Sequence, residues 1–182
     1  MHPRLAAVID YADRARTELM ATVDAVPEPL REARPTEDAW SVAEILEHLY
    51  LVERGVAKLV ALKAGELQTQ PAPPQEAPEM VPVPLARFMV DRTTRVLAPE
   101  RVVPRGEMSA AEACAALLQT RGMLLDQLHT ADGLALSGVS HPHPIFGPLD
   151  LYEWIYMTGW HELRHAEQIR EVADQLAAHG SS

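Results

Sequence analysis

Three short polar signals, each followed by a segment with helical periodicity, constrain the fold of this chain most strongly. In each of them a serine or an aspartate stands three residues before a glutamate: Ser41 with Glu44, Ser109 with Glu112, and Asp150 with Glu153. In such a capping box the side chain of each residue binds the backbone amide of the other, and a helix begins there. We therefore expect long helices to begin near residues 42, 110 and 151.

Apolar residues recur at helical spacing after each of these signals and also near the N-terminus. The predicted helices cover residues 3–25, 42–64, 110–130 and 151–178. Pro27 and Pro29 end the first of them, and the second is expected to stop near Gly65. Alanine is abundant whereas valine, isoleucine, phenylalanine and tyrosine are sparse, which favours helix over strand. The predicted fold class is therefore all-α, a four-helix bundle.

The connection between the second and third helices is long and rich in proline. Residues 66–83 contain five prolines and read as an extended crossover, and a short helix is predicted across 85–97. A connection of this length suits two helices joined by a crossover rather than by a tight turn. Residues 137–148 are predicted to be a loop, in which His141 and His143 either line a pocket mouth or are solvated.

Composition limits the class of protein. A chain of 182 residues with 47% apolar residues fits one domain over 1–182 with one core. The formal charge of −10 argues against a nucleic-acid partner and against an anionic membrane surface. One cysteine, Cys114, excludes an intrachain disulfide. The first residues lack the apolar run of a signal peptide, and no stretch is long and apolar enough to span a membrane, so we predict a cytoplasmic protein.

The sequence His161-Glu162-Leu163-Arg164-His165 is the strongest chemical signal. Two histidines four positions apart lie on one face of a helix, because about 3.6 residues make a turn. The same face carries Trp154, Thr158, Gln168 and Val172, so the apolar pattern turns both imidazoles inward. His48 lies on the inward stripe of the second predicted helix and can offer a third nitrogen, although a histidine in that position is also compatible with an ordinary core residue.

The same letters spell the zinc-protease signature, in which the glutamate beside the first histidine activates water. We reject that interpretation for this chain. Glu162 lies off the face of the two histidines, only seventeen residues follow His165, and the composition does not supply the sheet that such proteases contain. Three histidines instead suit an open site for Zn²⁺ or Ni²⁺, with Fe²⁺ or Co²⁺ as alternatives.

Three further residues are candidates for the pocket or for contacts with the metal ligands. Glu44, one turn before His48, is explained by its capping box, and contact with a ligand is the alternative. Gln168 either hydrogen-bonds a ligand or links two helices. Arg121 lies on the inward stripe of the third helix, where it forms a structural ion pair or binds an anion in the pocket.

Several segments together resemble the DinB/YfiT-like metalloenzyme family. They are residues 40–49, 141–149, Glu153-Trp154 and 161–170, and the resemblance extends from about residue 5 to 176. It implies a four-helix bundle in which three histidines hold a metal, with His48, His161 and His165 at the ligand positions. It also implies a homodimer. Some relatives transfer low-molecular-weight thiols such as bacillithiol or mycothiol, and others are described as hydrolases.

Two functions therefore remain open from the sequence. The first is a metal-dependent enzyme, either a thiol S-transferase or a hydrolase, whose partners are a low-molecular-weight thiol and a small electrophile. The metal would activate the thiol or water as nucleophile. The second is a non-catalytic stress-response protein that binds a metal or a small ligand.

Overall fold

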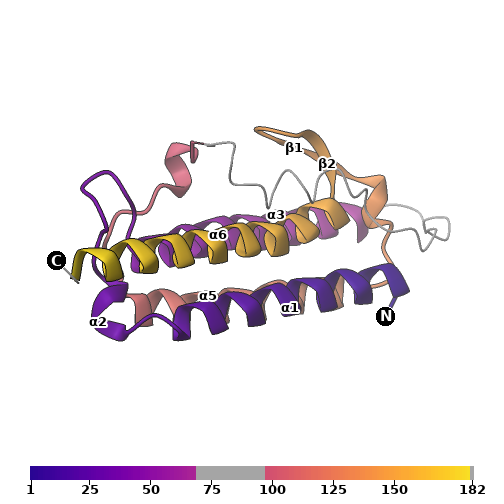
Figure 1. Cartoon of the computed structure of the whole chain (residues 1–182). Helices are drawn as coiled ribbons and strands as arrows, with labels where there is room; N and C mark the ends of the chain where they lie inside the picture. The colour runs from indigo at the N-terminus through magenta and orange to yellow at the C-terminus, as the bar shows by residue number, and fades with distance from the viewer. Residues whose placement is uncertain (69–96, 181–182) are drawn as a thin grey trace.

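The structure is a computed structural model that describes residues 1–68 and 97–180. Four long helices run side by side (Figure 1), namely α1 (Pro3–Asp24), α3 (Val42–Gln68), α5 (Ala110–Thr130) and α6 (Leu151–Gly180). Helix α1 packs along α6, α5 packs along α3, and α3 and α6 are in contact. The predicted all-α four-helix bundle is confirmed.

All three predicted capping boxes are present, which explains why the helix starts are where the sequence places them. Ser41 N donates to Glu44 Oε2 at 2.9 Å and Glu44 N donates to Ser41 Oγ at 3.2 Å. The pairs at the starts of α5 and α6 show the same reciprocal pattern. Each box satisfies backbone amides that a helix leaves without a partner in its first turn.

Helix α3 is longer than predicted. It passes through Gly65 and continues to Gln68, so residues 66–68 belong to the helix and not to the crossover. A glycine inside a helix costs about 1 kcal/mol, and the burial of Ala64 and Leu67 on either side of it offsets this cost. The rest of the predicted crossover, and the predicted helix across 85–97 except for its last residue, lie outside the described residues.

Five short elements complete the described part of the chain. They are α2 (Glu28–Arg31), η1 (Glu100–Val102), η2 (Leu136–Gly138), β1 (Ser140–His143) and β2 (Gly147–Asp150). The two strands form an antiparallel hairpin in which Ser140 pairs with Asp150, so the prediction of a loop over 137–148 is wrong. The prolines of this segment lower its strand propensity, but prolines are tolerated at the edges that a two-stranded hairpin offers.

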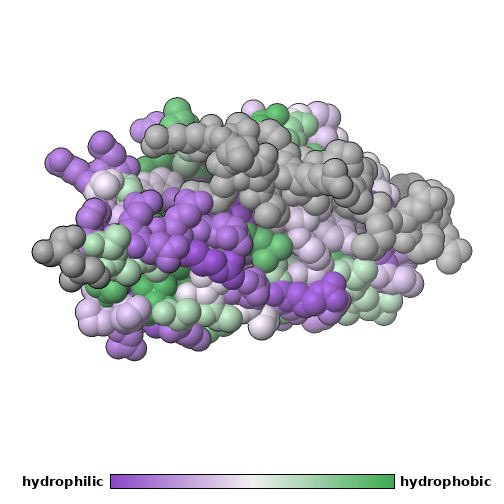
Figure 2. Space-filling model, viewed as in Figure 1, coloured by the Kyte–Doolittle hydropathy of each residue, from purple (hydrophilic) through white to green (hydrophobic). Residues whose placement is uncertain are grey.

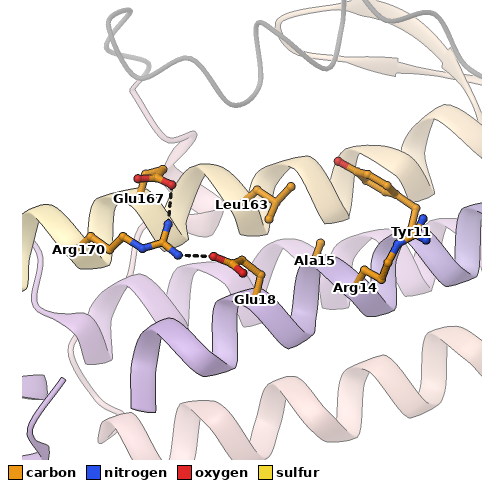
Figure 3. A pocket seen from close by; sticks show the side chains of 7 residues that line it. All are labelled: Tyr11, Arg14, Ala15, Glu18, Leu163, Glu167 and Arg170. Atoms are coloured by element: carbon orange, nitrogen blue, oxygen red, sulfur yellow. Dashed lines mark hydrogen bonds and ion pairs between the residues drawn. The ribbon is translucent and has the colours of Figure 1, made fainter. Parts of the chain in front are cut away.

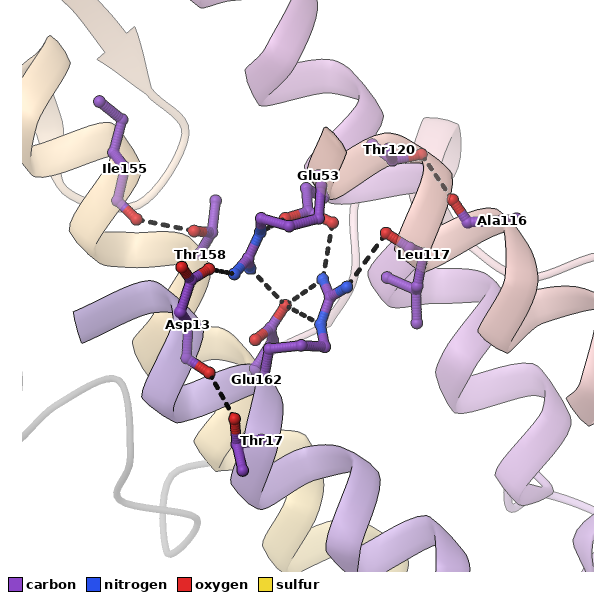
Figure 4. Close-up of polar contacts among 11 residues, drawn as sticks. Asp13, Thr17, Glu53, Ala116, Leu117, Thr120, Ile155, Thr158 and Glu162 are labelled. Atoms are coloured by element: carbon purple, nitrogen blue, oxygen red, sulfur yellow. Dashed lines mark hydrogen bonds and ion pairs between the residues drawn. The ribbon is translucent and has the colours of Figure 1, made fainter. Parts of the chain in front are cut away.

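The core consists of two apolar clusters separated along the bundle by a layer of charged side chains. One cluster contains Leu5, Val60, Leu128 and Ile155, and the other contains Leu19, Ile45, Leu117 and Ile169. The buried side chains of Arg16, Glu53, Arg121 and Glu162 lie between them in each of the four helices. Figure 4 shows Glu53 and Glu162 at the centre of this layer.

A close approach of α1 to α6 depends on Gly159. A Cβ atom at this position would lie 2.8 Å from the ring of Tyr11, which is too short for any side chain larger than hydrogen. On the face that carries α1 and α6, Figure 2 shows a run of hydrophilic side chains with apolar ones beside it. Among the described residues, no helix has the length and apolar character that crossing a membrane would require.

Candidate metal centre

Three histidines from two helices converge at one end of a cavity. His48 is supplied by α3, and His161 and His165 are supplied by successive turns of α6. The Nε2 atom of His161 lies 3.2 Å from Nε2 of His48 and 3.1 Å from Nε2 of His165. One nitrogen of each ring lies within 4.8 Å of the other two. The residues that the sequence nominated as ligands are therefore brought together by the fold.

Hydrogen bonds on the opposite side of the ring orient two of the three imidazoles. His48 Nδ1 lies 2.6 Å from the carbonyl oxygen of Val102, and His165 Nδ1 lies 2.7 Å from Gln168 Oε1. A carbonyl oxygen and an amide oxygen only accept, so each Nδ1 carries the proton and donates it. The lone pair of each ring is consequently on Nε2, the atom that faces the other histidines.

Burial favours the neutral form of these rings, which is the form that binds a metal. Desolvation lowers the pKa of His48, and it lowers the pKa of His161 well below 6.5, with a further lowering by the neighbouring His165. At neutral pH both rings are therefore uncharged. Three imidazolium ions this close would repel one another strongly, whereas three neutral rings present three lone pairs to one point.

The donor set fits a divalent transition metal. An ion bound to imidazole nitrogen at about 2.0–2.1 Å in tetrahedral geometry separates its ligand atoms by about 3.3 Å. The two Nε2–Nε2 separations of 3.1 and 3.2 Å are close to that value. Three protein ligands leave a further position for water or another molecule, which distinguishes an open site from a closed structural one.

The three histidines line a large cavity of about 1280 Å³. Its walls come from the segment before α3, from α3, α6 and η1, and from the hairpin, and they include Trp40, His143, Phe146 and Trp154. His141 and His143 both line it, so they face the pocket and not only the solvent. The indole Nε1 of Trp154 donates to the carbonyl of His141 at 3.1 Å, which fixes the hairpin over α6.

Glu162 points away from the histidines, into the charged layer of the core. Arg16 Nε and Arg121 Nη2 each donate to Glu162 Oε1 at 3.0 Å, and Glu162 is 2% exposed. It does not line the cavity. The rejection of a zinc-protease arrangement agrees with this geometry, because the glutamate that such an enzyme needs beside its metal is bound to arginines instead.

Arg121 belongs to the same layer and does not line the pocket. Its Nε donates to Glu53 Oε1 at 2.7 Å and its Nη1 donates to Asp13 Oδ1 at 3.0 Å. The alternative of an anion-binding group in the pocket is therefore replaced by the structural ion pair. Attraction to Glu162 and Glu53 raises the pKa of the Arg121 guanidinium despite the opposing effect of burial.

The remaining two candidates for contact with the metal ligands, Glu44 and Gln168, differ in whether they reach a histidine. Glu44 closes its capping box and also pairs with Arg34. Its described contacts thus explain it without any contact to a ligand, and the pKa of its carboxyl is lowered by these hydrogen bonds although burial opposes the effect. Gln168, in contrast, contacts His165 directly and lines the cavity.

Two contributors to the site were not identified from the sequence. The Val102 carbonyl holds His48, and the buried carboxylate of Glu47 accepts from the backbone amides of Arg105 and Gly106 at 3.1 and 2.9 Å. Glu47 thereby ties the segment after η1 to α3, next to His48. A carboxylate directly before His48 and next to Leu46 was the available signal, whereas a backbone acceptor leaves no signal in the sequence.

A second, smaller pocket lies between α1 and α6 and is unrelated to the histidines. It has a volume of about 370 Å³, and Arg170 spans it by pairing with Glu18 and Glu167 (Figure 3). Tyr11 and Arg14 stand at its other end. The described residues that line it include no histidine and no cysteine.

Comparison with known proteins relates this chain to a family. The model of the DinB superfamily matches residues 11–169. The uncharacterized Bacillus subtilis protein YuaE is 25% identical over 165 residues, which cover 90% of this chain and 96% of YuaE. The crystal structure of TT2238, a four-helix bundle protein, aligns with a TM-score of 0.58 at 20% identity over 92% of this chain and 98% of that one. This last likeness concerns the fold alone.

Proposed function

The chain belongs to the DinB superfamily, and from this membership and the three-histidine cluster we propose that it is a metal-dependent enzyme that transfers a small thiol to an electrophile. The expected metal is Zn²⁺ or Ni²⁺, held by His48, His161 and His165, with Fe²⁺ or Co²⁺ as the alternatives that imidazole also suits. When bound there, the ion supplies the Lewis acidity that lets a thiol lose its proton at neutral pH.

One observation favours a thiol over water as the nucleophile. Asp38 is the only carboxylate among the described residues that line the cavity, and it is exposed. Metal-assisted hydrolysis commonly uses a carboxylate near the metal as general base, but Glu162 is bound to Arg16 and Arg121. Metal coordination deprotonates a thiol outright, whereas it lowers the pKa of bound water only to about 7, so a thiol depends less on such a base.

The residues of the chain have definable roles in this reaction. The carbonyl of Val102 and the amide of Gln168 keep two rings with Nε2 toward the ion. The aromatic side chains of the walls would contact the apolar part of a substrate, and the cavity has room for a thiol and a small electrophile together. Overall, a sulfur–carbon bond forms, the bond from that carbon to its leaving group breaks, and the thiol proton passes to solvent.

The test is a comparison of metal content and thiol-dependent turnover. Purified protein is analysed for bound metals and is then assayed with glutathione, cysteine, bacillithiol and mycothiol against 1-chloro-2,4-dinitrobenzene. We expect about one divalent ion per chain and turnover with at least one thiol, both lost in His161→Ala. His129→Ala is the control, because His129 is exposed at the end of α5 and does not line the cavity.

Other results would replace this proposal with a specific alternative. Metal-dependent hydrolysis of activated esters, without thiol transfer, would make water the nucleophile. Stoichiometric metal without any turnover would favour a non-catalytic metal-binding protein. A folded protein that takes up none of the four metals would contradict both the enzyme and the binding protein.

A further inference from the structure

The cavity over the histidines has a charge opposite to that of the chain as a whole. The chain contains 16 lysines and arginines and 26 aspartates and glutamates. Among the described residues, four cations but one carboxylate line the cavity: Arg54, Lys58, Arg101 and Arg164, with Asp38. An excess of one sign inside a concave surface concentrates ligands of the other sign. The described part of the lining therefore attracts anions, whereas the chain as a whole has a net charge of −10.

These cations come from three separate elements, so they are not the solvated face of a single helix. Arg54 and Lys58 belong to α3, Arg101 to η1 and Arg164 to α6. Arg54 is engaged by Tyr50, to whose hydroxyl it donates at 3.1 Å and whose ring it covers. Arg101 and Arg164 line the cavity from η1 and α6, and the charge of Arg101 acts on the ring of His143, whose pKa it helps to lower.

The third component is the ring of His143 on the hairpin. The backbone amides of Ile145 and Phe146 donate to its Nδ1 at 3.2 and 3.3 Å. Because Nδ1 accepts, the neutral ring carries its proton on Nε2. Burial and the nearby Arg101 lower the pKa of His143 to about 4, so the ring is neutral at physiological pH. His143 is thus a fixed hydrogen-bond donor in the cavity wall, without a charge of its own.

The ring is also held rigidly, which suits a residue that recognises one group. It stacks on Phe146 with 4.7 Å between ring centroids and an angle of 20°, and its centroid lies 5.0 Å from that of Trp154. Trp154, Trp40 and Met157 extend the apolar wall beside it. A donor and two guanidinium groups next to an aromatic wall match a molecule with an anionic end and an apolar body.

We propose that this cavity binds a small organic anion with an apolar body, whose anionic group lies between His143 Nε2 and the guanidinium groups of Arg101 and Arg164. This inference rests on the proposed function in one respect, namely that the anion is the thiol or the electrophile of the reaction. His143 is then a specificity-determining residue that contacts the substrate.

The proposal is tested by the binding of three probes that share one body and differ in charge. They are 4-phenylbutyrate, 4-phenyl-1-butanol and 4-phenylbutylamine, and binding is measured by titration calorimetry on the metal-loaded protein and again after chelation. We expect the carboxylate to bind about tenfold more tightly than the alcohol in both forms, and the amine most weakly. Raising the salt concentration from about 0.1 M to 1 M should remove most of that preference, because it shortens the screening length from about 10 Å to 3 Å.

Substitutions then assign the preference to the named side chains. The double variant with Arg101→Gln and Arg164→Gln should lose most of the carboxylate preference and bind the alcohol unchanged. His143→Leu should weaken the carboxylate several-fold while His143→Gln, which keeps an N–H donor, weakens it less. Arg14→Gln is the control, since Arg14 is exposed and lines the other pocket. Circular dichroism of each variant verifies the fold.

The outcomes separate this inference from the proposed function. Equal binding of carboxylate and alcohol would overturn it, and so would a preference that survives the double variant or is present only with metal bound, since the metal itself would then hold the anion. Because the titrations on chelated protein need no metal, the anion preference can hold in a protein that fails every test of thiol transfer, and the reverse is equally observable.

Discussion

His161 and Glu162 are neighbours in the sequence, yet their side chains point to different sides of α6. His161 Nε2 lies 3.2 Å from His48 in the lining of the cavity, whereas Glu162 Oε1 accepts from Arg16 and Arg121 in the core. Successive residues of a helix are about 100° apart around its axis, so one turn can present a metal ligand to one side and an ion pair to the other. His161 is therefore placed for metal binding, and Glu162, the next residue, is placed for the ion pairs of the core.

The charged layer is expected to contribute to stability and not to metal binding. Arg121→Ala should lower the free energy of unfolding by about 3–5 kcal/mol, because Arg16 alone then faces the two buried carboxylates of Glu53 and Glu162, and one negative charge is left uncompensated in the core. Arg14→Ala removes an exposed pair with Asp10 and should cost less than about 1 kcal/mol. Urea denaturation of chelated protein measures both. Equal effects of the two substitutions would contradict a structural role for the layer.

Gln168 is expected to tune metal affinity. Gln168→Ala removes the acceptor that holds the Nδ1 proton of His165, and it should weaken metal binding by about 10–100-fold. Gln168→Glu keeps an oxygen acceptor and should weaken it less. Gln119→Ala on the exposed side of α5 is the control. Competition against a chromogenic chelator gives the affinities, and an unchanged affinity in Gln168→Ala would show that the hydrogen bond does not orient the ligand.

Glu47 is expected to act on His48 indirectly. Glu47→Ala releases the amides of Arg105 and Gly106, so the segment that carries the Val102 carbonyl loses its attachment to α3. The prediction is a several-fold weaker affinity for metal together with a lower melting temperature. Glu66→Ala is the control, because Glu66 is an exposed glutamate of the same helix that pairs with Lys63 three residues before it. This control should leave the affinity for metal unchanged. If Glu47→Ala lowers the melting temperature but leaves the affinity for metal unchanged, the role of Glu47 is structural only.

Metal removal should destabilise the bundle, since the three ligands join α3 to α6. A ligand that binds only the folded state at a hundred times its dissociation constant adds about 2.7 kcal/mol to stability. Chelation of metal-loaded protein should therefore lower the melting temperature by several degrees, and addition of the metal should restore it. The same treatment of His161→Ala is expected to change nothing. Identical melting curves of the wild-type protein with and without metal would rule out the bridge.

The metal-free protein should lose stability on mild acidification. The pKa of His161 in the folded state is well below 6.5, whereas in the unfolded state it is near 6.5. The unfolded state therefore binds more protons below pH 6.5, so stability is fully present above that pH and falls as the pH decreases below it. Denaturation of chelated protein at pH 7.5, 6.5 and 5.5 gives the slope. His161→Gln should flatten it and His129→Gln should not.

The sequence determined the helices, because the information for them is local. A capping box needs only a serine or aspartate and a glutamate three residues later, and helical spacing of apolar residues marks the inward face, so α3, α5 and α6 begin where Ser41, Ser109 and Asp150 predict. The HxxxH face follows from the pitch of one helix in the same way. The end of α3 was less predictable, because tertiary burial of Ala64 and Leu67 outweighs the low helix propensity of Gly65.

The tertiary structure decided everything that depends on two segments meeting. Arg121 could have bound an anionic ligand in the pocket or paired with carboxylates of the protein. Which of the two occurs depends on the residues of α1, α3 and α6 that pack against it, and these are Asp13, Glu53 and Glu162. Pairing across the hairpin brings His143 into the cavity wall, a placement that local propensity did not predict. The acceptor for His48 is a backbone carbonyl 54 residues away. Every residue but proline has the same backbone groups, so only the fold determines which carbonyl lies beside which imidazole.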